Sequence, residues 1–513
     1  SISLLKHSKK LFSSTRTDIG SMKNIYNTHL SLTRGETYLP LKYKTLPQAL
    51  EDATNKHSKD LFLFSKHQNS RYSYEELSHF SDTIARCFIG LGVQSNDKIG
   101  IYAPSCSEWV FSQFAIPKVG GVLVNLNPAY QTKDLEYTLN KTQISTLILP
   151  SKYKNSNYVE ILNSIDPGFT EKTQNRRNLS LKNLPYLKRV ILLDNLSVGN
   201  HHSRHHEEIA KDNNFITWEE MLSDYDSLKY SEIVHGRTEK LRPYELANIQ
   251  FTSGTTGTPK GAMLSHFGII NNGDIFGSLL GLGPGDVYQN ITPLYHCSGS
   301  IMGNIATLMS GSAMVYPEPS FSPKSALESL IEDGITTMHA VPAMYAEILN
   351  CLLHSNHYKE IKSQLKVKKG MVGGSLCPEY LMNRLFTELG LSKLRSGFGM
   401  TELSPVCHIT SLSDSLLKKT TTVGRSIPHT QTKIVDNEGN IVPRGKEGEI
   451  CVNSFSRMIG YYEDEEATSK AFDSEGFLRT GDIGIIDEEG FLSIVGRKKE
   501  IIIRGGENIS PKE

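Results

Sequence analysis

The sequence predicts an α/β protein with two successive α/β portions and a smaller β region behind them. Between about residues 43 and 149, helical patterns alternate with short buried strands, which favours parallel sheets. A second α/β portion extends from about residue 241 to 410. From residue 421 to 495 the pattern changes to short strands with glycine turns, which predicts a small distorted β barrel or sheet.

The first α/β portion shows both helix starts and strands. A helix is expected to open at residues 45–50, and Ser73 followed by Glu76 forms a capping-box pattern that begins another. Residues 98–102 and 146–149 are apolar runs of strand length and predict buried strands.

The β region after residue 421 shows strand and turn patterns in succession. Residues 432–435 and 448–452 are expected to be strands, and the Asp-Asn-Glu-Gly-Asn run at 436–440 is expected to be a turn between them. No internal repeat is visible.

The overall composition excludes several classes of protein. Of 513 residues, 38% are hydrophobic and 21% charged, which is ordinary for a globular chain. The 55 basic residues balance the 55 acidic ones, so no general affinity for nucleic acid is expected. The seven cysteines include no Cys-x-x-Cys pair, which argues against a disulfide framework and a cysteine zinc site. No apolar run is long enough to span a bilayer.

The segment from residue 168 to 214 is largely polar and contains four histidines between residues 201 and 206. Such a cluster can bind a metal ion, but Glu207 and Glu208 follow it and no cysteine framework surrounds it. A solvated surface insertion is therefore the favoured interpretation.

The amino-terminal segment differs in composition from the rest. Its first 24 residues carry five basic side chains and six serines against one acid, Asp18. Leu4, Leu5, Leu11 and Phe12 fall on one face of a helix. This pattern predicts a mitochondrial transit peptide within residues 1–34 and thus a location in the mitochondrial matrix; the alternative is a disordered terminus.

Residues 252–261 read Thr-Ser-Gly-Thr-Thr-Gly-Thr-Pro-Lys-Gly. Glycines let backbone N–H groups approach anionic oxygens, hydroxyl groups donate hydrogen bonds and lysine adds a charge, so the run predicts a polyphosphate-binding loop. Its spacing is not that of a Walker loop. The flanking apolar residues suggest that the loop joins a strand to a helix, and the alternative is a flexible surface loop.

Together with this loop, three more motifs resemble the adenylate-forming enzymes, the superfamily of acyl-CoA synthetases, firefly luciferase and peptide-synthetase adenylation domains. They are Gly-Phe-Gly-Met-Thr-Glu at 397–402, Thr-Gly-Asp at 480–482, and Gly-Arg-Lys-Lys-Glu at 496–500 followed by 505–509. The runs at 127–130 and 293–297 resemble a mitochondrial acyl-CoA synthetase branch that acts on medium-chain fatty acids. The resemblance covers residues 40–513, and four ordered motifs make it specific.

The resemblance implies a domain organisation. Residues 35–496 are expected to form a large N-terminal AMP-binding domain of two stacked α/β subdomains plus the distorted β barrel at 421–495. Residues 497–513 would hold the hinge and only the start of a small C-terminal α+β domain. The lysine of that domain, in its Pro-Lys-Thr-x-x-Gly-Lys pattern, has no counterpart here.

The resemblance also assigns the phosphate and metal ligands. Thr401 is expected to bind the α-phosphate and Glu402 to bind Mg²⁺, a hard cation that prefers oxygen ligands; structurally, the pair could instead cap a helix. The phosphate loop is expected to act through Thr252, Ser253, Gly254, Thr255, Thr256, Gly257 and Lys260.

For adenosine, the resemblance places an aromatic ring, a glycine wall and a carboxylate. Asp482 would accept hydrogen bonds from both ribose hydroxyls, with Arg497 beside it. Phe398 replaces the usual tyrosine, so stacking on adenine remains but the phenolic hydroxyl is lost. The other expected positions are the wall residues Gly373, Gly374 and Ser375, Gly399 next to the ring, and Lys499 at the hinge.

His296 is expected near the substrate carboxylate, where it would gate the acid or the incoming thiol; the alternative is an ordinary core histidine. Peptide-synthetase adenylation domains generally place an aspartate in this segment to pair with the substrate ammonium; because residues 295–299 include no acid, the resemblance argues against an amino-acid substrate. The small residues Gly299, Ser300, Gly303 and Ala306 are expected to leave room for an acyl tail.

The implied activity is ATP-dependent formation of an acyl-adenylate from a fatty acid, followed by transfer to coenzyme A. The expected ligands are ATP, Mg²⁺, coenzyme A and a small-molecule fatty acid. Two alternatives remain open: a truncated nucleotide- or acyl-binding module that no longer turns over, and a ligase for an aryl or other carboxylate.

Overall fold

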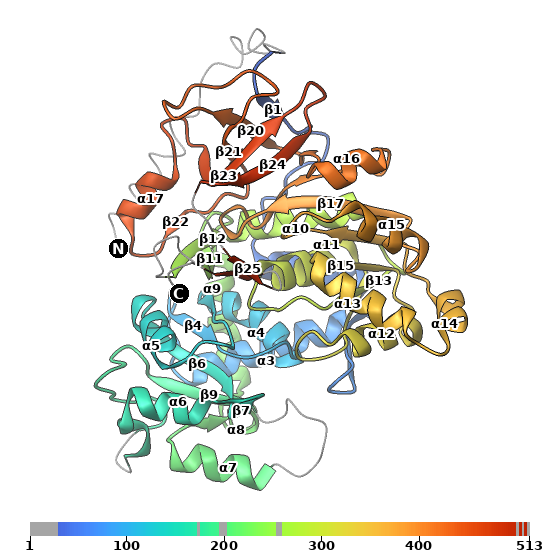
Figure 1. Ribbon diagram of the computed structural model, residues 1–513. Helices are drawn as coiled ribbons and strands as arrows, with labels where there is room; N and C mark the ends of the chain where they lie inside the picture. The colour runs from blue at the N-terminus through green and yellow to red at the C-terminus, as the bar shows by residue number, and fades with distance from the viewer. Residues whose placement is uncertain are drawn as a thin grey trace.

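A computed structural model describes residues 29–171, 175–193, 203–252, 259–498, 502–504 and 507–509. Within these ranges the chain forms three large sheets and two short hairpins (Figure 1). The predicted α/β class is confirmed, because two of the large sheets are mixed and carry helices. The hairpins are β7 (Lys152–Tyr153) with β8 (Ser156–Asn157), and β25 (Ile502–Arg504) with β26 (Glu507–Ile509).

The first large sheet has eight strands and is parallel except at one end. The predicted strands near residues 98–102 and 146–149 are its central members, and its last two strands pair antiparallel. In spatial order the strands are β10 (Ile216–Thr217), β9 (Arg189–Leu193), β6 (Ile144–Pro150), β4 (Lys98–Ile101), β5 (Val122–Asn125), β11 (Leu246–Thr252), β12 (Lys260–Ser265) and β22 (Gly460–Tyr461).

The second large sheet has nine strands, with a parallel centre and antiparallel strands at both ends. In spatial order they are β19 (Arg425–Ser426), β18 (Val406–Ile409), β17 (Lys393–Gly399), β16 (Lys369–Val372), β15 (Thr337–Ala340), β13 (Val287–Asn290), β14 (Ala313–Tyr316), β2 (Leu61–Ser65) and β3 (Ser70–Ser73).

The third sheet is the predicted β region, which lies at the top of Figure 1. It is an open antiparallel sheet, not a closed barrel: β1 and β24 are its edges, and no pairing joins them in the described residues. Residues 29–34, placed in the amino-terminal segment by the sequence analysis, contribute β1. In spatial order, the strands of this third sheet are β1 (Leu32–Arg34), β20 (Thr430–Val435), β21 (Gly448–Ser454), β23 (Leu478–Ile486) and β24 (Leu492–Arg497).

Side-chain caps mark the start of several helices. Ser73 accepts a hydrogen bond from the Glu76 backbone while Glu76 returns one, which confirms the predicted capping box. The α-helices are α2 (Leu46–His57), α3 (Tyr74–Gly90), α4 (Ser107–Lys118), α5 (Thr132–Lys141), α6 (Tyr158–Ile165), α7 (Ser203–Asp212), α8 (Trp218–Tyr225), α9 (Ser231–Lys240), α10 (His266–Leu280), α11 (Ala306–Ser310), α12 (Pro323–Glu332), α13 (Pro342–Leu353), α14 (Tyr358–Gln364), α15 (Glu379–Thr387), α16 (Leu416–Thr421) and α17 (Glu465–Ala471).

Short helices of other types occur at four places in the described chain. Three are 3₁₀ turns and one is a π-helix that directly follows His296. They are η2 (Pro167–Thr170), η3 (Leu228–Tyr230), the π-helix η4 (Ser298–Ile305) and η5 (Thr401–Leu403).

Hydrogen bonds of buried polar side chains connect the eight-stranded sheet to the nine-stranded sheet. Asn125 on β5 donates to the carbonyl of Tyr295, which follows β13, at 3.0 Å. Asn248 on β11 donates to Asn125 at 2.9 Å, and Gln250 donates to Asn248 at 2.7 Å. All three amides are buried, so the chain segment around His296 is fixed to the eight-stranded sheet.

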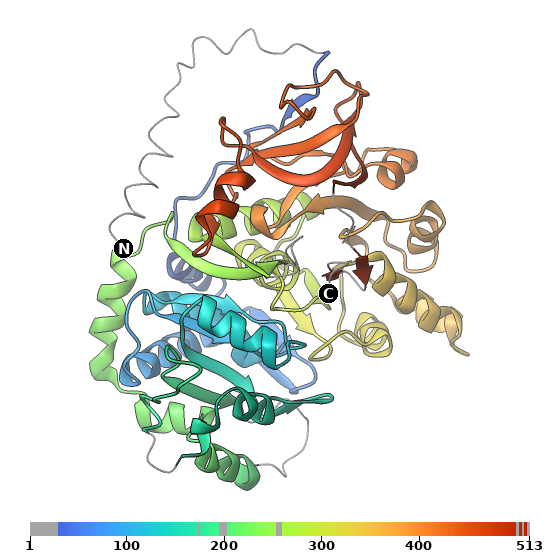
Figure 2. The same cartoon turned by 60° about the vertical axis from the view of Figure 1, so that its left-hand side comes forward.

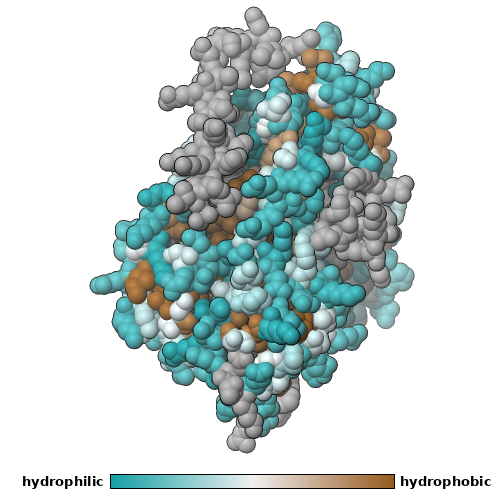
Figure 3. Space-filling view, turned by 90° about the vertical axis from the view of Figure 1, so that its left-hand side faces the viewer, coloured by the Kyte–Doolittle hydropathy of each residue, from teal (hydrophilic) through white to brown (hydrophobic). Residues whose placement is uncertain are grey.

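The outer surface is mainly hydrophilic on the face shown in Figure 3, with small separate apolar patches. Figure 2 shows the sheets from another side. Across the described residues, none of the helices has both the length and the apolar character that crossing a bilayer requires.

Three buried histidines predict sensitivity to acid. Burial lowers the pKa of His266, His339 and His408 to about 3, from 6.5. Protons therefore bind the unfolded chain more readily, and stability is lost as pH falls below 6.5. Between pH 7 and about 5 each histidine is expected to cost roughly 2 kcal/mol, measured as the denaturant midpoint at both pH values.

His408→Gln should reduce this acid sensitivity, because glutamine does not titrate and still reaches the hydroxyls of Ser426 and Thr432 near the ring. His235→Gln, at a position whose side chain is 74% exposed, should leave it unchanged. Equal pH dependence in His408→Gln and the parent would contradict this account.

Candidate active site

Several of the predicted site residues lie at the carboxyl ends of strands in the nine-stranded sheet. His296 follows β13, Gly373 and Gly374 follow β16, and Phe398 lies at the end of β17. β13, β15, β16 and β17 run parallel, so the loops after them open on the same edge. In open α/β sheets this edge is where ligands bind.

The predicted phosphate loop joins two antiparallel strands, which corrects the expectation of a strand-to-helix connection. β11 pairs with β12 over its length, ending with Thr252 opposite Lys260. The helix starts only at His266, where Ser265 caps α10 by accepting from the Gly268 backbone at 3.1 Å. Lys260–Ser265 was missed as a strand because its apolar residues also suit a helix start. The expected ligands Ser253, Gly254, Thr255, Thr256 and Gly257 lie outside the described residues.

Glu402 is the centre of the hydrogen bonds at this edge. It is 5% exposed, in the 3₁₀ turn η5. Its Oε1 accepts from the hydroxyl of Tyr461 at 2.8 Å and from that of Thr252 at 3.4 Å. In the described chain no partner is seen for Oε2. A buried carboxylate with one oxygen held and the other unpaired is suited to bind a cation.

Thr401 connects this carboxylate to the His296 segment. Its hydroxyl lies 3.8 Å from the Sγ of Cys297, whose neighbour is His296. Burial raises the pKa of the Cys297 thiol to about 12, and the charge of Glu402 adds to the effect. The thiol therefore stays protonated and is a packing group, not a nucleophile.

His296 itself is exposed. Its Nδ1 lies 3.1 Å from the hydroxyl of Ser298 and accepts from the Ser298 backbone at 3.3 Å. The core-histidine alternative is therefore wrong, since the ring is at the surface of the site edge.

Asp482 and Arg497 come from the third sheet, where they are direct partners across β23 and β24. Asp482 is 2% exposed, and its Oδ1 accepts from Arg497 Nε at 2.7 Å. Its Oδ2 is buried and has no hydrogen-bond partner among the described residues. Burial raises the pKa of this carboxyl, Arg497 opposes the effect, and Glu402 adds a smaller repulsion. The unpaired oxygen is a ready acceptor for a ligand hydroxyl.

The glycines expected to border adenine leave little space for any side chain. A Cβ on Gly373 would meet Met371 and the Gly397 carbonyl, and one on Gly399 would collide with the Pro405 carbonyl. Gly374 has a φ of +82°, which disfavours other residues. Phe398 is half-buried, with its ring centroid 6.1 Å from that of His408. Ser375 is exposed.

At two of the small residues after His296, protein atoms already occupy the place where a side chain would begin, so these glycines themselves do not support the predicted room for an acyl tail. A Cβ on Gly303 would overlap the Asn290 amide, and one on Gly299 would overlap the Pro293 carbonyl. Ser300 is buried and donates to the His296 carbonyl at 3.0 Å. The glycines are needed because protein atoms already fill the space beside them.

At the predicted hinge, the structure describes Lys498 but not Lys499, the residue that was expected to act there. Lys499 lies outside the described residues, while Lys498 pairs with Glu449 at 3.2 Å. Of the histidine cluster, His201 and His202 are outside the described part as well. Elsewhere in the described chain, no group of three His, Cys, Asp or Glu side chains is arranged to hold a metal ion.

The sequence analysis missed Tyr461, which contacts Glu402 and lies next to Lys260. Lys260 Nζ is 5.1 Å from the centroid of the Tyr461 ring. No phosphate-type motif surrounds Gly460-Tyr461, and only the pairing of β22 with β12 reveals its position.

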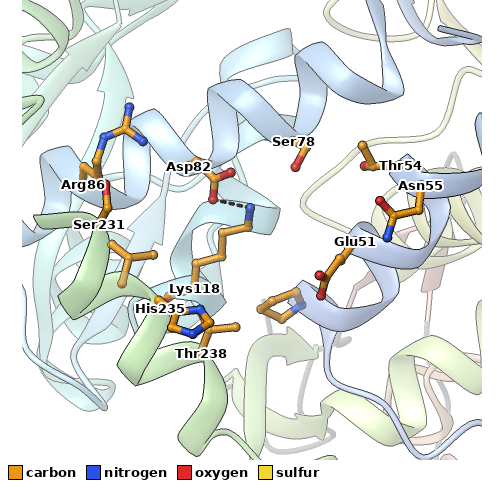
Figure 4. Close-up of a pocket in the computed structure, with 12 residues that line it drawn as sticks. Glu51, Thr54, Asn55, Ser78, Asp82, Arg86, Lys118, Ser231, His235 and Thr238 are labelled. Carbon is orange, nitrogen blue, oxygen red and sulfur yellow. Dashed lines mark hydrogen bonds and ion pairs between the residues drawn. The ribbon is translucent and has the colours of Figure 1, made fainter. Parts of the chain in front are cut away.

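A cavity of about 470 Å³ opens elsewhere, between α2, α3, α4 and α9 (Figure 4). Its buried cation Lys118 is already paired with Asp82 at 2.5 Å, and Arg86 is paired with Asp226 at 2.6 Å. None of the predicted site residues lines this cavity, so it is separate from the edge described above.

Comparisons with known proteins agree with this geometry. The family described as AMP-binding enzyme matches residues 50–462. The chain is 33% identical to a putative acyl-CoA synthetase, YngI, of Bacillus subtilis, covering 92% of this chain and 82% of that protein. It is 32% identical to the mitochondrial medium-chain acyl-CoA ligase ACSF2 of Homo sapiens, covering 94% and 76%. The fold resembles ATP-bound MatB from Rhodopseudomonas palustris, with a TM-score of 0.69, 23% identity, and coverage of 92% and 82%.

Gly303→Ala tests whether the space beside η4 is filled. The added methyl group has to displace the Asn290 amide, so the variant should lose about 1–3 kcal/mol of unfolding free energy, measured by chemical denaturation. Gly283→Ala is the matched control, since no atom lies within 4 Å of its added Cβ. Unchanged stability in Gly303→Ala would show that an open channel exists.

Asp482→Asn tests whether the ionised carboxylate of Asp482 contributes to the stability of the folded protein. A raised folded pKa means that stability is lost as pH rises through it, so at pH 7 the ionised group contributes no net stability. The variant should keep its melting temperature, because Arg497 is partly exposed and can be solvated.

Asp473→Asn is the matched contrast. The bonds of Asp473 to the buried Lys433 outweigh its burial and lower its pKa, so this loss should cost a few kcal/mol. A larger loss of melting temperature at position 482 than at 473 would contradict the assignment.

Proposed function

This chain belongs to the AMP-binding enzyme family, and we propose that it activates a medium-chain fatty acid with ATP and transfers the acyl group to coenzyme A. The acid's carboxylate attacks the α-phosphorus, which gives an acyl-adenylate and pyrophosphate. The thiol then attacks the activated carbonyl and releases AMP. The observation that carries the proposal is the buried, unpaired Oδ2 of Asp482 beside the carboxylate of Glu402.

Asp482 is assigned to the ribose of ATP. Oδ1 is held by Arg497, and a buried acceptor without a donor costs free energy until a ligand supplies one. A ribose offers two neighbouring hydroxyl groups, which match the two oxygens of one carboxylate. The adenine ring is assigned to the half-buried ring of Phe398, on which it would stack.

The phosphate end is assigned to residues around Glu402. Lys260 provides positive charge and Thr401 a hydroxyl donor for the phosphates, with Thr252 and the loop at 253–257 completing the set. Glu402 fits a magnesium ion, because its Oε2 is unpaired in the described chain and phosphate oxygens would complete the ligand set. When bound, the ion neutralises charge on the phosphates.

His296 is assigned to the reacting carboxylate. It is exposed at the site edge and connected to Thr401 through Cys297, so it lies beside the α-phosphate position assigned to Thr401. The medium chain length is proposed from the relatives' names, and the tail would lie elsewhere than along the filled glycines of η4. The basic amino-terminal segment and the mitochondrial relatives support a matrix location.

The test is pyrophosphate release from ATP·Mg²⁺ with acids from acetate to palmitate, with and without coenzyme A. Release is expected to depend on the acid and to peak at intermediate length. Lys260→Ala and Glu402→Ala should each lower kcat/KM by about 100-fold or more, because each removes charge stabilisation in a low-dielectric site.

Lys118→Ala serves as the matched control, since it removes a lysine that lies in the separate cavity; its activity per folded molecule should stay unchanged. ATP binding without release for any acid would instead favour the nucleotide-binding module. Unchanged turnover in both site variants would contradict the assignment of Lys260 and Glu402.

A further inference from the structure

Tyr461 lies where the eight-stranded sheet meets the site. It is on β22, the edge strand, and pairs with Ala262 of β12 (Figure 1). Lys260 is two residues before Ala262, on the same face of its strand, and is therefore the diagonal neighbour of Tyr461. The ammonium group lies 5.1 Å from the ring centroid, within the range of a cation–π contact.

The hydroxyl of Tyr461 points the other way, to Glu402. It donates to Oε1 at 2.8 Å, and its direction is fixed because an ionised carboxylate can only accept. One half-buried side chain thus contacts both groups.

Two hydrogen-bond donors fix the orientation of the Glu402 carboxylate. Tyr461 and Thr252 both bind Oε1, from two strands of the eight-stranded sheet, while Glu402 belongs to the turn after β17 of the other large sheet. Rotation of the carboxylate would break a hydrogen bond to a charged acceptor, which is among the stronger kinds. Oε2 is thereby kept available.

We propose that Tyr461 is a positioning residue: its hydroxyl orients the Glu402 carboxylate toward the metal–nucleotide complex, and its ring holds the Lys260 ammonium beside it. The inference rests on the proposed roles of Glu402 and Lys260. Tyr461 itself need not touch ATP. Because it links the two groups, their spacing is set before the nucleotide arrives, which is the preorganisation that charge stabilisation requires.

The experiment measures ATP affinity by calorimetry, with Mg²⁺ and with EDTA, and uses the ratio of the two affinities as readout. This ratio does not depend on turnover, and a merely structural defect would lower both affinities together. Tyr461→Phe keeps the ring but removes the donor. It is expected to reduce the ratio about tenfold and to leave the affinity in EDTA unchanged.

A Glu402→Gln background tests whether Tyr461 acts through the Glu402 carboxylate. Glu402→Gln alone should abolish most of the metal effect, and adding Tyr461→Phe should then change nothing further, because the tyrosine acts through the carboxylate. Tyr462→Phe is the matched control; it removes the hydroxyl of the next tyrosine, whose ring lies near Lys98 and not near Glu402.

Tyr461→Leu removes the ring as well. It should also weaken ATP binding in EDTA by several-fold, and this additional loss should disappear in a Lys260→Ala background.

Two outcomes would overturn the inference. They are an unchanged ratio in Tyr461→Phe, whether both affinities stay the same or fall together, and a further loss of the metal effect in the double variant with Glu402→Gln. If Glu402→Gln itself keeps the full metal effect, the proposed metal role of Glu402 fails, and the role of Tyr461 fails with it.

Discussion

The arrangement of the site depends on a row of hydrogen bonds between buried side-chain amides, which connects the eight-stranded sheet to the nine-stranded sheet. Asn125, Asn248 and Gln250 are nearly excluded from water, so each needs a partner of fixed direction. Apolar packing alone tolerates small shifts between sheets, whereas these bonds allow one register. The register holds the segment that carries His296 against β5 and β11, and β11 ends at Thr252, which reaches Glu402.

Two buried carboxylates dominate the charge at this edge. Glu402 and Asp482 are both buried acids, and each has a basic residue close by: Lys260 is connected to the first through Tyr461, and Arg497 bonds to the second. In both carboxylates one oxygen is used by the protein and the other has no partner in the described chain. The fold thus presents two separated acceptors that the protein itself leaves unsatisfied.

Features set by local chemistry could be predicted from the sequence. The capping box at Ser73 needs only residues three apart, and the turn at 436–440 needs only its own side chains. The motif residues Thr401, Glu402 and Asp482 were found because their order along the chain is distinctive. The structure describes them close to one another, although their roles stay predictions.

Features set by distant partners could not be predicted. β12 was taken as part of a helix start because its antiparallel neighbours, β11 and β22, cannot be read from its own residues. β1 was assigned to the terminal segment because its partner β20 is about 400 residues away. Gly303, in the π-helix η4, suggested empty space, yet the Asn290 amide that fills it comes from the strand β13. Tyr461 escaped notice for the same reason.

The unpaired oxygen of Asp482 also bears on how long the folded chain survives. A ligand that donates to this oxygen binds only the folded state, so by mass action it shifts the balance away from unfolded chains. Proteases cleave mainly opened molecules, and their rate follows the population of those molecules. If the proposed nucleotide is such a ligand, the lifetime of the protein would follow the supply of nucleotide, and molecules without it would be degraded first.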